Sequence, residues 1–130
     1  MAAGKRLSGP GVCAVTQSLA GAVATATHGT GRNLPCLAAD ITGVRLLTAA
    51  GEDLTITQEE DSDRLRAAQV SLGALGVIRG LRVALRPSFR LHRRTWAEPL
   101  GSIIADAAAR WERHRNFEFF YIPFSGWGMC

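Results

Sequence analysis

The 130-residue sequence has no long apolar run, no internal repeat and no low-complexity tract. A transmembrane helix requires about 20 apolar residues in succession, so no integral membrane segment is expected. The N-terminus superficially resembles a signal peptide, but Pro10, Gly11 and Gln17 interrupt its apolar part. With 47% hydrophobic and 20% charged residues, the composition is typical of a globular protein. We expect a cytoplasmic location, with association at a membrane surface as the alternative.

Cysteine is scarce, and its pattern excludes two kinds of fold. Cys13, Cys36 and Cys130 make an odd count, and none of them belongs to a CxxC pair. A disulfide framework or a structural zinc site is therefore not the organising principle of the chain. We predict no metal site, and a reducing compartment fits this usage best.

Lysine is almost absent, because Lys5 is the only one, and arginine supplies nearly all of the net charge of +4. Several arginines gather in one part of the sequence: Arg79, Arg82, Arg86, Arg90, Arg93 and Arg94. Aromatic residues do not interleave them as a base-stacking surface would need. Solvated surface arginines are the simpler interpretation, and no nucleic-acid partner is expected.

The first half of the chain begins with an irregular lead-in, Met1–Thr16, that shows no usable period. Leu19–Thr27 consists of small and β-branched residues, which favour a tightly packed strand. The glycines of His28–Gly31 then allow backbone angles that other residues avoid. Arg32–Asp40 continues as a loop that contains Pro35.

A β-hairpin is predicted next, because Ile41–Thr48 and Leu54–Thr57 flank a turn that contains glycine. The acidic residues that follow complement a helix N-terminus, and Asp61 or Ser62 is a suitable cap. This helix should run to about Leu72, where glycines punctuate its exit.

The second half of the chain should form a strand over Val77–Leu85, which Pro87 ends, and an extended segment over Phe89–Trp96. One apolar stripe at helical spacing then predicts a second helix. The stripe consists of Leu100, Ile103, Ile104, Ala107, Ala108 and Trp111. Phe117–Phe124 reads as an aromatic strand. No segment after it is expected to form a neighbouring strand, and an unpaired strand is an aggregation hazard. We therefore expect that the chain is cut and that it is marginally stable.

The segment Gly21–Gly31, GAVATATHGTG, is the first candidate for chemistry. Its small residues let a backbone approach a bulky ligand, its threonines offer hydroxyls, and loop amides after it can cradle a phosphate. It matches neither a Walker loop nor a dinucleotide fingerprint. A tight corner between a strand and a loop explains the residues equally well.

The remaining candidates leave the chemistry open. His28 is a lone histidine without a second metal ligand or a paired nucleophile, so a local hydrogen bond is the simpler role. The stretch Val70–Gly80, VSLGALGVIRG, reads either as a connection from helix to strand or as a backbone wall against a planar ligand. The residues alone do not decide between these two interpretations.

Together the two stretches resemble a known family. ATATHGTG at Ala24–Gly31, followed by VSLGALGVI at Val70–Ile78, is similar to the flavin-binding domain of the vanillyl-alcohol-oxidase superfamily. The nearest resemblance is to aldonolactone oxidases of the gulonolactone and arabinonolactone type and to alditol oxidases. The hairpin between the stretches fits the same pattern, and HRNFEFFYIPF at His114–Phe124 resembles the opening of the family's substrate-binding domain.

The resemblance implies an α+β fold and FAD as the cofactor. It assigns residues 17–95 to the second half of a PCMH-type FAD-binding domain, and 96–130 to the first elements of a truncated substrate-binding domain. The positions that match cofactor contacts in the family are Ser18, Gly21, Thr25, Ala26, Thr27, His28, Val77 and Ile78.

The resemblance also implies a reaction, in which a CH–OH group of a sugar lactone or alditol gives a hydride to the flavin. Electrons then pass to oxygen or another acceptor. The family's upstream half of the flavin domain and most of its substrate domain have no match here, so no residue can be nominated as the catalytic base. The alternative is a non-catalytic α+β module that has lost FAD, and this chain alone is expected to be inactive.

Overall fold

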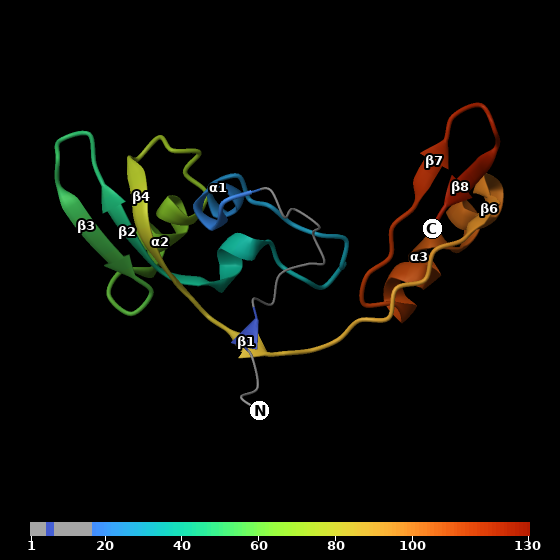
Figure 1. Cartoon of the computed structure of the whole chain (residues 1–130), viewed down its shortest axis with the longest axis horizontal. Coiled ribbons are helices and arrows are strands. Elements are labelled where there is room, and N and C mark those ends of the chain that lie inside the picture. Colours follow the sequence, from blue (N-terminus) through green and yellow to red (C-terminus); the bar gives the residue numbers. More distant parts are fainter. Residues whose placement is uncertain (1–4, 7–16) are drawn as a thin grey trace. The chain divides into compact units, whose positions relative to one another are not determined.

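The computed structural model describes residues 5–6 and 17–130, which fall into two compact units. One unit contains residues 1–29 and 35–88, and the other contains residues 30–34 and 89–130. Each unit combines a small antiparallel sheet with helix, which confirms the α+β class (Figure 1). The assignment of residues 17–95 and 96–130 to two functional domains stays a prediction.

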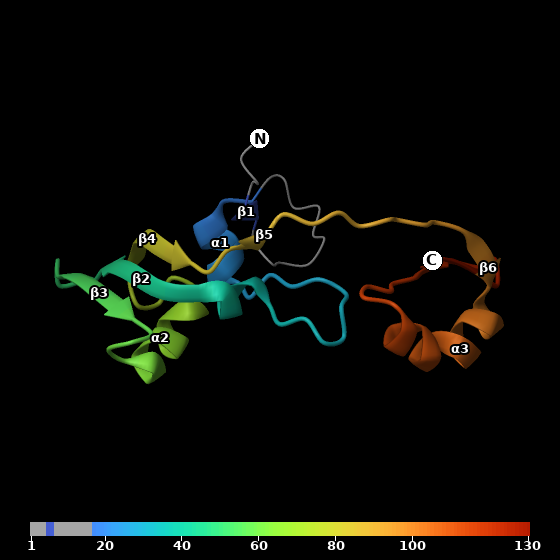
Figure 2. The same ribbon diagram turned by 90° about the horizontal axis from the view of Figure 1, so that it is seen from below.

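The sheet of the first unit has the order β3-β2-β4 and is antiparallel throughout. Its strands are β2 (Ile41–Leu47), β3 (Asp53–Thr57) and β4 (Val77–Val83). Figure 2 shows them side by side with β2 in the middle. The predicted hairpin of β2 and β3 is confirmed, and Gly51 in its turn has a φ of +83°.

Short elements complete this unit. A 3-10 helix, η1 (Leu37–Asp40), leads into β2. The strands β1 (Lys5–Arg6) and β5 (Arg86–Pro87) pair with each other, so part of the expected irregular lead-in is a strand. The rest of that lead-in lies outside the described residues. Phe89–Trp96 forms no hydrogen-bonded strand.

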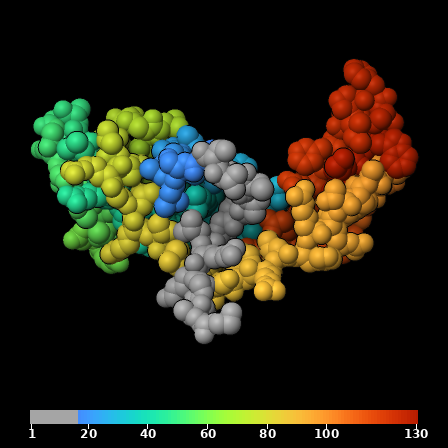
Figure 3. Space-filling view, viewed as in Figure 1, coloured from blue at the N-terminus to red at the C-terminus, as the bar shows by residue number. Residues whose placement is uncertain are grey.

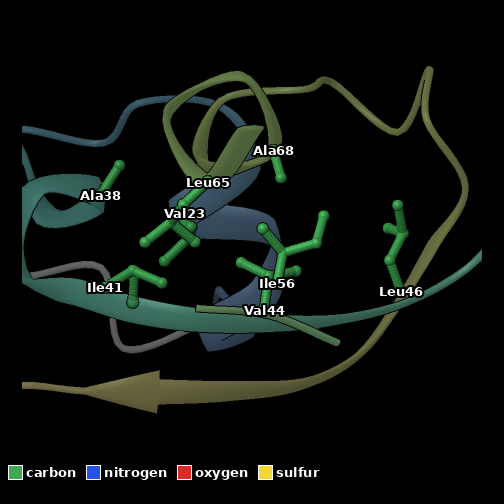
Figure 4. Close-up of a cluster of buried hydrophobic side chains, with 8 residues drawn as sticks. All are labelled: Val23, Ala38, Ile41, Val44, Leu46, Ile56, Leu65 and Ala68. Carbon is green, nitrogen blue, oxygen red and sulfur yellow. The ribbon is translucent and has the colours of Figure 1, made fainter. Parts of the chain in front are cut away.

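The core of the first unit lies between one face of the sheet and two helices, α1 (Leu19–Ala24) and α2 (Ser62–Gln69). In Figure 4 the side chains from the strands and from the helices point toward one another. The buried cluster consists of Val23, Ala38, Ile41, Val44, Leu46, Ile56, Leu65 and Ala68. Charged residues belong to the opposite face, where Asp53 pairs with both Arg45 and Arg79. This alternation is what an antiparallel sheet with one solvated face requires.

The predicted strand over Leu19–Thr27 is wrong, because its first six residues form α1. Ser18 caps this helix, and its Oγ accepts a hydrogen bond from the Gly21 N–H at 3.1 Å. Alanine and leucine are strong helix formers, and Val23 is the only β-branched residue within the helix. The β-branched Thr25 and Thr27 lie after its end.

Both predicted helices, α2 and α3, are confirmed. Asp61 is the N-cap of α2, and its carboxylate accepts from the Arg64 N–H at 2.9 Å. This helix ends at Gln69, three residues before the predicted end. In the second unit, α3 spans Leu100–Arg113 and buries Ile103 and Ala107 of the predicted stripe. No helix in the described part of the chain is long and apolar enough to cross a membrane.

The second unit corrects the expectation of an unpaired aromatic strand. Only Phe120–Ile122 of the aromatic run forms a strand, β7, and it pairs with β8 (Trp127–Met129). The strand β6 (Ala97–Pro99) lies on the other side of β8. A tight turn therefore supplies the neighbour within the last residues of the chain. The aromatic strand is therefore paired, and it no longer indicates a cut chain or a marginally stable sheet.

The second unit is held by a half-buried cation on α3. Arg110 pairs with Glu98 of β6 and, at 3.0 Å, with Asp106 of its own helix. Its hydrogen bonds hold the pKa of both carboxyl groups below their ordinary values of 4.5 and 3.8, and they raise the pKa of Arg110 itself. The ion pairs thus join the sheet and the helix of this unit.

We expect Leu65→Ala to lower the free energy of unfolding of the first unit by about 2–5 kcal/mol, because it leaves a cavity between α2 and the sheet. Leu65 is only 2% exposed. Leu85→Ala is the control, since Leu85 is half exposed. Urea unfolding followed by far-UV circular dichroism measures both, and equal losses for the two variants would contradict the described core.

Gly76→Ala should destabilise the chain more than Gly73→Ala does. Both glycines have positive φ, at +133° and +78°, so both alanines are strained, by about 1–3 kcal/mol each. A Cβ at Gly76 would also overlap the Leu47 carbonyl oxygen, whereas one at Gly73 would meet nothing. The urea concentrations at the unfolding midpoint provide the comparison. A smaller decrease of the midpoint for Gly76→Ala than for Gly73→Ala would contradict the close approach of Gly76 to the Leu47 carbonyl oxygen.

Glu98→Gln should weaken the second unit at neutral pH and flatten its response to acid. A carboxyl group whose folded pKa is depressed contributes stability above its unfolded pKa, near 4.5 here, and loses it as pH falls through the folded value. Tryptophan fluorescence reports this unit selectively, because Trp96, Trp111 and Trp127 all belong to it. In thermal melts, the wild type should have a clearly higher melting temperature than the variant at pH 7 but not at pH 3. The exposed Glu118→Gln is the control, and equal behaviour of both variants would rule out the Arg110 linkage.

Candidate functional site

The two glycine-rich stretches meet in the folded chain. The Leu72 N–H donates to the Ala24 carbonyl oxygen at 3.2 Å, which ties the segment before β4 to the end of α1. The helix α1 also contacts β4 itself, and the two adjoin at the surface in the space-filling view, in blue and yellow (Figure 3). Residues about 50 positions apart thus lie side by side, and residues 18–28 and 71–78 together are called the wall below.

Threonine hydroxyls close the end of α1. The backbone N–H and the Oγ1 of Thr25 both donate to the Gly21 carbonyl oxygen, at 3.2 and 2.9 Å. The Thr27 Oγ1 lies 3.5 Å from that of Thr25 and donates to the Gln17 side chain at 3.4 Å. Because these hydroxyls already form hydrogen bonds to other groups of the protein, a ligand could use only their remaining donor or acceptor capacity.

The backbone after α1 is held in an uncommon conformation. Ala26 has a φ of +54°, in the left-handed region that residues with a Cβ seldom adopt. Bonds on both sides fix it, because the Ala26 N–H donates to Val23 and the Thr27 N–H donates to Ala22. The Thr27 carbonyl oxygen accepts from Leu37 at 3.0 Å. This strained corner is therefore part of the folded framework of the first unit.

His28 makes a local contact, as expected from its sequence context. Its side chain is exposed, and the Nδ1 lies 3.0 Å from the carbonyl oxygen of the adjacent Gly29. Within residues 5–6 and 17–130, no three His, Cys, Asp or Glu side chains converge as a metal site would require. Cys36 and Cys130 are free thiols.

The second stretch offers an apolar surface beside this corner. Leu72 and Val77 are 75% and 65% exposed, and Leu75 is about half exposed, at 46%. Ile78 instead packs against the core of the first unit. Of the two predicted β4 contacts, Val77 is therefore accessible through its side chain, and Ile78 is half-buried.

One polar group in this stretch was not foreseen from the sequence. The Ser71 Oγ is buried, and within residues 5–6 and 17–130 it has no hydrogen-bond partner. Nothing in the pattern VSLGALG distinguishes this serine from an ordinary residue of a connection between helix and strand. The exposed Gly21, the apolar surface and the orphaned hydroxyl together suit a large ligand that is partly apolar and partly polar, and FAD fits that description.

A hollow of about 210 Å³ lies elsewhere, in the second unit. It is lined by Arg32, Asn33, Leu34, Trp111, Glu112, Arg113, His114 and Arg115. Arg32 and Glu112 form an ion pair. None of the predicted cofactor residues lines this hollow, so it does not belong to the wall formed by the glycine-rich stretches.

Comparison with known proteins gives related sequences but no matching family model. An L-gulono-1,4-lactone dehydrogenase of Mycobacterium tuberculosis is 41% identical over 109 residues, which cover 84% of this chain and 25% of that protein. An L-gulonolactone oxidase of Scyliorhinus torazame is 30% identical over 82% of the chain and 24% of its own length. An alditol oxidase of a Streptomyces species is 42% identical over 62% of the chain and 19% of its own length.

The chain therefore spans about a quarter of the length of the curated relatives that it matches. The similarity extends over most of the chain itself, including both glycine-rich stretches in the longer matches. The chain belongs by homology to the FAD-linked gulonolactone, arabinonolactone and alditol oxidases.

Proposed function

We propose that this chain supplies part of the FAD site of an oxidoreductase that oxidises a CH–OH group of a sugar lactone or an alditol. The observation that carries the proposal is the hydrogen bond from the Leu72 N–H to the Ala24 carbonyl oxygen. It joins the two stretches that resemble flavin-binding segments into one wall. The names of the relatives support the substrate class, because they act on gulonolactone or on alditols.

Within this proposal the first stretch approaches the cofactor mainly through backbone and small side chains. Gly21 is exposed on α1 and leaves room for close approach. The Ser18 oxygen accepts from Gly21, and its hydroxyl donates to no group in the described part of the chain, while the Thr25 hydroxyl keeps an acceptor site. The loop that follows α1 contains Ala26, Thr27 and His28.

The second stretch contributes an apolar and main-chain surface. Val77 and Ile78 begin β4, and Val77 is exposed, as are Leu72 and Leu75 before it in the sequence. An exposed apolar surface suits a planar ring system. FAD, when bound, accepts the hydride, and the residues of this chain bind and orient it.

The electron acceptor and the catalytic base are not assigned to residues of this chain. The relatives include both a dehydrogenase and oxidases, so oxygen and other acceptors both stay open. From the family resemblance we propose that residues 17–95 are part of an FAD-binding domain and that 96–130 are the start of a substrate-binding domain. We expect the chain alone to be inactive.

One observation favours the alternative, a non-catalytic module without FAD. The hydroxyls of Ser18, Thr25 and Thr27 each already take part in a hydrogen bond within the protein. A surface that satisfies its own polar groups can exist without a ligand. Direct measurement of FAD binding separates the two functions.

Gly21→Leu should abolish or strongly weaken FAD binding, because its side chain fills the approach to the wall at α1. The matched control is Gly101→Leu, since Gly101 is an exposed helical glycine on α3 with nothing near its added Cβ. Both changes raise helix propensity. The Cβ added at Gly21 would lie 3.1 Å from the Ser18 Oγ, so this capping side chain must shift slightly in the variant. Quenching of flavin fluorescence during titration with the wild-type chain and both variants gives the dissociation constants.

The expected result is a wild-type affinity that Gly101→Leu retains and Gly21→Leu loses by at least about tenfold, the loss of one well-made contact. Far-UV circular dichroism should show equal helix content. Absence of binding by the wild type would favour the module without FAD. Equal binding by both variants would mean that FAD lies elsewhere on the chain.

A further inference from the structure

Ser71 is the polar residue of the wall that lacks a partner. Its side-chain oxygen is buried, the residue is 8% exposed, and no group in the described part of the chain bonds to that oxygen. An unpaired buried hydroxyl costs about 1–3 kcal/mol. Native structures seldom retain such a group unless a water or a ligand satisfies it.

The position of Ser71 connects it with both stretches. It follows Val70, the C-cap of α2, and precedes Leu72, whose N–H bonds to Ala24 at the end of α1. Leu72 has a φ of +51°, which places its side chain on the surface at 75% exposure. Ser71 therefore lies at the junction of the two glycine-rich stretches, next to an exposed leucine in the sequence.

We propose that Ser71 is a cofactor-anchoring residue, whose hydroxyl obtains its missing hydrogen bond from a polar atom of FAD. This inference rests on the proposed function. A serine hydroxyl moves between staggered positions by rotation about a single side-chain bond. The oxygen can therefore change its direction without any change in the backbone.

The proposal has opposite consequences for the free and the bound chain. In the free chain the hydroxyl gains nothing from burial, so Ser71→Ala should leave the melting temperature unchanged or raise it. In the bound chain the same substitution removes a hydrogen bond, and FAD affinity should fall about tenfold. A purely structural serine predicts the reverse, with a lower melting temperature and no specific loss of affinity.

The test uses the full chain and three variants. Ser71→Ala removes the hydroxyl, and Ser71→Cys keeps nearly the same volume with a much weaker donor. Ser102→Ala removes an exposed hydroxyl on α3 as the control. Flavin fluorescence gives FAD affinities, and far-UV circular dichroism gives melting temperatures without FAD. Riboflavin and ADP, titrated separately, show which half of the cofactor bonds to Ser71.

Weaker FAD binding by both Ser71 variants, with wild-type affinity for Ser102→Ala and no loss of stability, supports the proposal. If Ser71→Ala binds FAD within twofold of the wild type, Ser71 is no anchor, although the FAD site stands. If only the alanine variant weakens binding, side-chain volume and not the hydroxyl is responsible, and the proposal is overturned. A wild-type chain that does not bind FAD removes this proposal and the proposed function together. Should Ser71→Ala fail to fold, Ser71→Cys decides the question.

Discussion

Val23 packs from α1 into the core over β2, and the position of the candidate site depends on this contact. The residue is fully buried among Ile41, Val44 and Leu65. Because it anchors α1 against the sheet, the Ala24 carbonyl oxygen comes within reach of the Leu72 N–H. Core packing thus determines where the polar and strained backbone of the site lies. The short helix α1 would be marginally stable as an isolated helix, so its stability depends on this packing.

Local signals were sufficient where one segment determines its own structure. The hairpin of β2 and β3 follows from alternating residues around Gly51, and α2 follows from the Asp61 cap. They were insufficient at Leu19–Thr27, where composition suggested a strand, but the Ser18 cap and tertiary packing of Val23 produce a helix. Local signals also failed to predict β8, because the three residues Trp127–Met129 are too few to show a strand pattern in the sequence.

The candidate site was predictable to a similar extent. The resemblance identified both glycine-rich stretches, and the fold brings them together. It did not reveal that the hydroxyls of Thr25 and Thr27 are engaged within the protein, because those bonds depend on the exact end of α1. Nor did it single out Ser71, since an unpaired buried hydroxyl is a property of three-dimensional packing and leaves no mark in a sequence.

If residues around α1 and residues before β4 form one FAD-binding wall, bound FAD should protect both. Hydrogen–deuterium exchange of the wild-type chain, with and without saturating FAD, tests it most directly. The account predicts slower exchange in both stretches, Ser18–His28 and Ser71–Ile78, and unchanged exchange in Leu100–Arg113 of the second unit. Protection of only one stretch, or none in either, would contradict the claim that the two act as a single site.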